Sequence, residues 1–311
     1  MPPEWAPHER TLIAWPCRRS LWGEALEDAR RETTGVANAI AAFEPVLMVC
    51  RPGDAGQARA SLAGEVEIWE TPIDDSWLRD SGPIVVTDGA RRGMQFGFNA
   101  WGGKFPPWDD DATIAGRLCE RLGLPWERSE LILEGGAIAV DGAGTLVTTE
   151  ECLLNPNRNP DWSREEIEEE LRSRLGVERV VWLPHGLVED RDTDGHVDLV
   201  AAFAGPERIA LLAVDDDNPN AERLAADREV LRAAGLDIVD ISGLVYEGDV
   251  AISPLNLYVC NGAVVMSDAD EAALAAVRVA FADREVVGVA ARALAFGGGG
   301  PHCITQQVPA G

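Results

Sequence analysis

The sequence predicts an α/β protein made of one repeated unit, in which two strands, a helix and a third strand follow one another. Two observations carry this prediction: paired apolar runs with strand character recur along the chain, and a helical segment and a short third apolar run follow each pair. The units are spaced by roughly 50–60 residues, the range in which repeats form arrays or propellers. Five such units closed in a ring would leave one central cavity.

The elements can be assigned in chain order. One strand pair is separated by the turn Asp141-Gly142-Ala143, and the helix after it starts with the capping signal Ser163-Arg164-Glu165-Glu166. The expected helices lie near Ala25–Ala42, Asp110–Leu122, Ser163–Leu175, Pro219–Ala234 and Asp270–Phe281. The expected strands are Thr11–Ala14, Val46–Val49, Val66–Trp69, Ile84–Val86, Met94–Phe98, Glu130–Leu133, Leu131–Val140, Gly144–Leu154, Arg179–Leu183, Val197–Ala204, Ile209–Val214, Asp237–Ile241, Leu257–Cys260, Ala263–Ser267 and Glu285–Ala290.

Length and charge narrow the class of protein. The 311 residues without a linker-like stretch predict a single domain over residues 1–311. The net charge of −26, from 53 acidic and 27 basic residues, argues against nucleic-acid binding, which needs clustered Lys and Arg. The same charge favours cationic ligands by long-range attraction, although solubility or adaptation to salt explains most of it.

The chain has the features of a cytoplasmic protein. It contains no run of about 18 apolar residues, so we expect no membrane span. The segment Met1–Pro7 has neither the basic nor the apolar region of a signal peptide. The six cysteines are scattered without a CxxC pair or a zinc-like spacing, which predicts reduced thiols and no metal site.

A glycine-rich segment near the end of the chain is the most informative motif. Gly297–Gly300 leads through Pro301 and His302 to Cys303. Four glycines disfavour helix and strand, but they let a backbone pass close to a ligand. A cysteine held there is a candidate nucleophile if a base lies nearby in space. The alternative is a flexible tail with a buried thiol.

Two acidic residues stand where the pattern does not require them. Asp80 lies in the segment Trp77–Gly82, and an ion-paired turn with Arg79 is the alternative for it. Glu134 ends the apolar run 131–133, where the alternative is an acid that faces solvent. A buried acid is unfavourable unless a cation or hydrogen bonds satisfy it, so both residues are candidates for binding a cation.

His196 and Asp198 are separated by one residue, so on a strand both would point to the same face. A metal site or a surface acidic loop are the alternatives for this segment. With Cys303 and two or three carboxylates, however, the pair forms a coherent set: a thiolate attacks, an imidazole moves protons, and carboxylates bind a planar cation. A guanidinium is the small cation that best matches two carboxylates and has a central carbon to attack.

Together these motifs identify a family. The chain resembles agmatine deiminases and the related bacterial-type peptidylarginine deiminase family, and the matching stretches run from the first residue to the last in the order of the family. The resemblance implies a five-bladed α/β propeller of pseudo-fivefold ββαβ repeats around a central active-site channel. The matching stretches are Met1–Glu9, Trp77–Pro83, Asn99–Lys104, Leu133–Gly136, Asp192–Asp198 and Gly299–Gln307.

The resemblance implies a role for each matched catalytic position. Cys303 corresponds to the nucleophile and His196 to the general acid and base. Asp80 and Asp198 correspond to the carboxylates that bind the guanidinium. No metal or organic cofactor is implied.

Three further positions are assigned to substrate binding. Trp77 corresponds to an aromatic residue that lines the site, and Glu134 lies in a matched stretch. Asp192 stands where agmatine deiminases usually have a glutamate that reaches the far amine of the substrate. Pro301 also departs from the aliphatic residue expected before His302.

The implied function is hydrolytic deimination of a small guanidino substrate, with agmatine giving N-carbamoylputrescine and ammonia through a covalent amidino intermediate on Cys303, as in putrescine biosynthesis. Alternatives are deimination of peptidylarginine, free arginine or another guanidino compound, amidino transfer to an amine, and a non-catalytic guanidine- or polyamine-binding protein. The expected partner is a small cationic guanidino compound, and a homodimer is compatible with the sequence.

Overall fold

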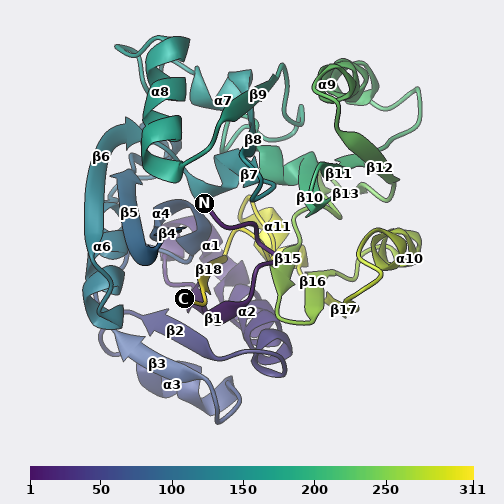
Figure 1. Ribbon diagram of the computed structural model, residues 1–311. Coiled ribbons are helices and arrows are strands. Elements are labelled where there is room, and N and C mark those ends of the chain that lie inside the picture. Colours follow the sequence, from purple (N-terminus) through teal and green to yellow (C-terminus); the bar gives the residue numbers. More distant parts are fainter.

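The computed structural model describes residues 1–311 and has an α/β fold, in which helices cover small sheets (Figure 1). Both ends of the chain lie near the middle of the view, because the last strand, β18 (Thr305–Pro309), pairs antiparallel with the first, β1 (His8–Ala14). No helix has the length and apolar character needed to cross a membrane.

Four sheets share one topology. In each, the first two strands of the unit are antiparallel, and the third lies parallel beside the second after a helical crossover. Their strands are β4 (Ile84–Asp88), β5 (Ala90–Gly97) and β6 (Trp126–Ile132); β7 (Ile138–Val140), β8 (Thr145–Thr149) and β9 (Arg179–Leu183); β10 (Ala201–Gly205), β11 (Arg208–Leu212) and β12 (Asp237–Ile241); and β15 (Tyr258–Cys260), β16 (Ala263–Ser267) and β17 (Glu285–Val289).

A fifth sheet joins the two ends of the chain. Its strand order is β18-β1-β2-β3, with β2 (Val46–Cys50) and β3 (Glu67–Glu70) parallel to β1. The sequence pattern did not predict β18. A separate hairpin, β13 (Val245–Glu247) and β14 (Val250–Ile252), precedes β15.

The helices range from single turns to sixteen residues. The longer ones connect the second and third strands of the units, as predicted. Their bounds are α1 (Arg19–Trp22), α2 (Leu26–Ala41), α3 (Ala55–Ser61), α4 (Leu78–Ser81), α5 (Ala100–Gly103), α6 (Asp111–Leu122), α7 (Glu150–Leu153), α8 (Arg164–Leu175), α9 (Ala221–Ala233), α10 (Glu271–Ala280) and α11 (Arg292–Phe296).

Helix α8 illustrates how the sequence sets these elements. The Ser163 hydroxyl accepts a hydrogen bond from the Glu166 amide, and the Glu166 carboxylate accepts one from the Ser163 amide, which closes the predicted capping box. Gly176 ends the helix in the left-handed conformation, with φ of 67°. Full burial of each large apolar side chain contributes about 1.5–3 kcal/mol. The buried face consists of Ile167, Leu171 and Leu175.

The structure corrects three predictions. Val197–Ala204 is not one strand, because residues 197–199 form a 3-10 turn and β10 begins at Ala201. Leu131–Val140 is also interrupted, because a 3-10 turn at residues 135–137 separates β6 from β7. Gly144–Leu154 is not one strand either, because β8 ends at Thr149 and residues 150–153 form the helix α7.

Candidate active site

Asp80 is held in a fixed orientation by two hydrogen bonds. It lies on the short helix α4, almost fully buried, and its Oδ1 accepts from the Gly136 amide at 3.0 Å. Its Oδ2 accepts from the Trp101 indole at 2.9 Å. Burial, reinforced by the charge of Asp198, raises the pKa of Asp80 to about 6. Arg79 does not pair with Asp80; its guanidinium contacts Glu4 at 3.2 Å.

The backbone that carries Trp101 is strained. Ala100 and Trp101 have φ of 52° and 54°, a region that L-residues rarely adopt. The Asn99 side chain holds the segment, because it accepts from the Gly102 amide at 2.8 Å and donates to the Asn157 carbonyl at 2.9 Å. The strain is therefore balanced by local hydrogen bonds, and it directs the indole N–H toward Asp80.

Asp198 is paired with a histidine that the sequence analysis did not use. His302 Nδ1 donates to Asp198 Oδ2 at 2.8 Å, and its Nε2 donates to Glu4 Oε1 at 2.7 Å. Burial opposes charge on the imidazole, but the two carboxylates raise the pKa of His302. Burial likewise opposes charge on Asp198, yet the bond to His302 lowers the pKa of this carboxyl. Asp198 Oδ1 is buried and makes no hydrogen bond within the protein.

The thiol of Cys303 lies between an acceptor and a donor. Its Sγ is 3.4 Å from Asp198 Oδ2 and 3.0 Å from Asn256 Nδ2. Burial and then the negative charges of Asp198 and Asp80 raise the pKa of Cys303 well above its ordinary value. A cation bound between the two carboxylates would offset their charge, so the site favours the thiolate when a cationic ligand is present.

His196 reaches the same point from the residue that precedes the 3-10 turn 197–199. Because neither His196 nor Asp198 lies on a strand, the prediction that a strand points both to the same face was wrong. The Asp190 carboxylate fixes the local backbone by accepting from the amides of Gly195 at 3.0 Å and His196 at 2.9 Å. His196 Nδ1 lies 3.9 Å from Asp80 Oδ1. Burial lowers and the charge of Asp80 raises the pKa of His196, and the net shift is well upward.

Gly136 lies where these groups converge. A Cβ added to it would lie 2.6 Å from His196 Nδ1 and 2.9 Å from both Asp198 Oδ2 and Asp80 Oδ1. Contacts under 3.0 Å are essentially never made by real Cβ atoms. The glycine is therefore required for the close approach of the imidazole and both carboxylates.

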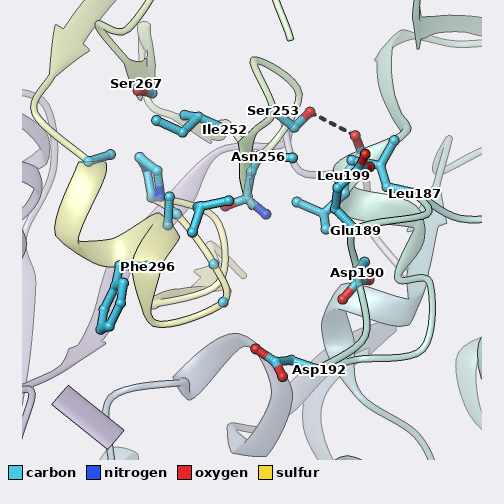
Figure 2. A pocket seen from close by; sticks show the side chains of 18 of the residues that line it. Leu187, Glu189, Asp190, Asp192, Leu199, Ile252, Ser253, Asn256, Ser267 and Phe296 are labelled. Carbon is cyan, nitrogen blue, oxygen red and sulfur yellow. Dashed lines mark hydrogen bonds between the residues drawn. The ribbon is translucent and has the colours of Figure 1, made fainter. Parts of the chain in front are cut away.

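The predicted residues Asp80, Cys303, Trp77 and Asp192 line one small pocket of about 20 Å³. Trp77 stacks on Trp22, with ring centroids 5.4 Å apart, and forms an apolar wall. A second cavity of about 130 Å³ lies next to the glycine-rich loop and shares Asp192 and Gly298 with the pocket (Figure 2). Its acidic lining residues are Glu189, Asp190, Asp192 and Asp249.

Two basic side chains near the pocket are already engaged. The guanidinium of Arg18 donates to the carbonyls of Phe105, Pro106 and Pro107 at 3.1, 3.1 and 2.7 Å. Lys104 Nζ lies 2.7 Å from the carboxylate of Asp194. Neither side chain therefore offers a free positive charge to the pocket, whose lining carboxylates, Asp80 and Asp192, suit a cationic ligand.

Glu134 is fully buried rather than solvent-facing, but it does not line the pocket. Its Oε1 accepts from Arg158 Nε at 2.6 Å. Potential ligand atoms of Glu134, Cys152 and His196 lie within 4.8 Å of one another, which makes them the group that could hold a metal ion. The guanidinium of Arg158 opposes a second cation there, so the geometry favours a supporting role for Glu134 beside His196.

Sequence reasoning missed three residues that contact the reacting groups. His302 and Trp101 lay inside matched stretches but were given no role. Asn256 belongs to no recognised motif; the only signal was a polar residue between Leu255 and Leu257, both of which are buried.

Comparisons with known proteins show which family the chain resembles over its whole length. The sequence model of the Porphyromonas-type peptidyl-arginine deiminases matches residues 1–309. A putative agmatine deiminase of Streptomyces coelicolor is 44% identical over 334 aligned residues, covering 99% of this chain and 98% of that protein. An agmatine deiminase of Pseudomonas aeruginosa is 40% identical over 351 residues, covering 100% and 95%. The solved structure of the agmatine deiminase of Enterococcus faecalis has a TM-score of 0.94 at 32% identity, covering 99% of this chain and 95% of that one.

Proposed function

Because the chain belongs to the Porphyromonas-type peptidyl-arginine deiminase family, we propose that it is a hydrolase that deiminates agmatine to N-carbamoylputrescine and ammonia. The observation that carries the proposal is the arrangement of Asp80, Asp198 and Cys303 in one buried site, with His196 beside Asp80. A guanidinium is planar and cationic and matches two carboxylates, and its carbon is electrophilic.

Asp80 and Asp198 bind the guanidinium of the substrate. The unpartnered Oδ1 of Asp198 supports this role, since a buried carboxylate oxygen is unfavourable without a donor. The bound cation offsets the charge that opposes ionisation of Cys303, and the thiol proton is released to water. The thiolate then attacks the guanidinium carbon.

His196 moves the protons of both half-reactions. Its raised pKa supports an imidazolium in the resting site, and this group protonates the departing ammonia. An amidino-thioether remains on Cys303. The neutral imidazole then takes a proton from water, the hydroxide adds to the amidino carbon, and the thiolate leaves with the ureido product free.

The amine tail of agmatine is recognised by Asp192. This residue joins the pocket to the acid-lined cavity of about 130 Å³, where negative charge suits an ammonium and opposes a carboxylate (Figure 2). The same negative charge disfavours free arginine, because it repels the α-carboxylate. Arg18, the basic residue on the pocket wall, cannot pair with that carboxylate, since its donors are directed at three carbonyls.

We further propose that the five main sheets are the blades of a five-bladed propeller. The shared topology of four sheets supports this arrangement, since each unit repeats an antiparallel pair followed by a parallel strand. The pairing of β18 with β1 also supports it, because a ring needs a contact between the first and last units.

The test is ammonia release from agmatine by purified protein without added metal, beside Cys303→Ala. We expect release that depends on Cys303, with N-carbamoylputrescine as the second product. Asp80→Asn and Asp198→Asn should each lose most activity, because a buried guanidinium would face one fewer charge. Wild-type kinetics in both variants would refute the binding of the guanidinium by Asp80 and Asp198. Release from arginine or arginine peptides but not from agmatine would reassign the substrate.

A further inference from the structure

A side-chain amide lies against the sulfur of the nucleophile. Asn256 is in the segment between β14 and β15, almost fully buried, and its Nδ2 donates to Cys303 Sγ at 3.0 Å. Its Oδ1 accepts from the main-chain amides of His302 at 3.2 Å and Cys303 at 3.4 Å. One side chain thus contacts both the reacting atom and the backbone that carries it.

The hydrogen bonds determine which way this amide is oriented. The amides of His302 and Cys303 can only donate, so they require the oxygen of Asn256, and the NH₂ group must therefore face the sulfur. Gly300 makes room for the contact, because a Cβ at this position would lie 2.6 Å from Asn256 Oδ1. The glycine-rich loop and Asn256 therefore fit each other closely.

The segment that carries Asn256 is anchored independently of the sulfur. The Ser253 hydroxyl donates to the Leu199 carbonyl at 2.7 Å, the dashed bond in Figure 2, and accepts from the Leu255 amide at 3.2 Å. Leu255 and Leu257 are buried on either side of Asn256. The amide is consequently presented by a rigid support.

The neighbours of the sulfur respond differently when the thiol ionises. The contact with Asp198 becomes a repulsion between two anions once the proton has left. The bond from Asn256 becomes a charge-assisted hydrogen bond and strengthens. This neutral donor thus stabilises the anion without competing for the cationic substrate.

We propose that Asn256 is a catalytic residue that stabilises the Cys303 thiolate through its side-chain N–H and aligns the sulfur through its bonds to the main chain. The inference rests on the proposed role of Cys303 as the nucleophile. The bond from Asn256 to the sulfur strengthens only when the thiol ionises, so loss of Asn256 should lower kcat by a larger factor than it raises KM for agmatine.

The test measures the ionisation of the Cys303 thiol in the absence of any guanidino substrate. Alkylation by iodoacetamide is followed against pH, from the mass of the peptide that contains Cys303, in wild type, Asn256→Ala and the isosteric Asn256→Asp. Loss of a hydrogen bond to an anion should raise the apparent pKa of the thiol by about 1–2 and lower kcat about 10- to 100-fold. Asn256→Asp should shift it further, since a carboxylate repels the thiolate.

Ser253→Ala is the matched control, because it loosens the same segment without removing the bond to sulfur. It should leave the alkylation profile within about 0.3 pH units of wild type. Equal shifts in Ser253→Ala and Asn256→Ala, or an unchanged profile in Asn256→Ala, would overturn the proposal. Because alkylation needs no substrate, a wrong substrate assignment leaves this result valid. If Asn256→Ala does not fold, Asn256→Asp decides alone.

Discussion

Gly136→Ala should inactivate the enzyme while leaving it folded. The new methyl group would lie 2.6 Å from His196 Nδ1 and 2.9 Å from carboxylate oxygens of Asp80 and Asp198. Ordinary contact begins at 3.4 Å, so the imidazole must retreat by about 0.8 Å and each carboxylate by about 0.5 Å. Misplacement of reacting groups by about 1 Å lowers the rate about 100-fold, so we expect kcat/KM to fall by at least that factor.

The assay is steady-state ammonia release from agmatine, together with thermal unfolding. Overpacking of a buried site destabilises a protein by about 1–3 kcal/mol, which predicts a lower Tm but an intact fold. The backbone of Gly136 does not require glycine, because its φ is outside the left-handed region. The effect therefore reports the contacts of the added methyl group and not backbone strain.

Gly35→Ala is the control. Gly35 lies inside α2, and a Cβ there would meet nothing within 4 Å. We expect unchanged kinetics and a gain of about 0.5–1 kcal/mol in stability, since alanine is favoured over glycine within a helix. A Gly136→Ala enzyme with kcat/KM within threefold of wild type would refute the convergence of the three groups at this point.

Three further predictions concern charge. With a pKa of about 6, Asp80 loses its charge below that pH, so kcat/KM should fall about tenfold per pH unit on the acid side, as initial rates would measure. Burial raises the pKa of Asp227 from 3.8 to about 7, so its ionisation destabilises the fold as pH rises through that window. Asp227→Asn should therefore raise Tm at pH 8 but not at pH 4, with an upper bound of about 4 kcal/mol; an equal gain at both would contradict this. Asp192→Asn should raise KM for agmatine about tenfold with kcat retained, and unchanged KM would remove Asp192 from amine recognition.

The repeating elements were predictable because they depend on local pattern. The helices α2, α6, α8, α9 and α10 lie within one or two residues of their predicted bounds, since apolar periodicity and capping signals such as Ser163 set them locally. Strand β18 was missed because Thr305–Pro309 is flanked by the glycine-rich motif and becomes a strand only through pairing with β1. Such non-local pairing has no short-range signature.

In the site, too, residues within local motifs were predictable, whereas contacts between distant residues were not. Cys303, Asp80 and Asp198 were identified from motifs, and the structure brings them together with His196. Glu134 was predicted to bind the substrate, and its pairing with Arg158, 24 residues further along the chain, was not indicated by any pattern.

The role of Asn256 could not be predicted from the sequence, because its partner is also distant along the chain. Its partner Cys303 is 47 residues further along the chain, and only the fold brings the two together.

The acidic surroundings of Cys303 have a consequence for the chemical stability of its thiol when no substrate is bound. A thiol kept protonated by burial and by two carboxylates is a poor target for peroxide or neutral alkylating agents, which react with thiolates. The positive charge of the bound ligand is what favours ionisation of the Cys303 thiol to the reactive thiolate. An electrophile that carries an amidinium would therefore promote formation of the thiolate with which it reacts. Selective covalent inhibitors of this enzyme should accordingly be cations.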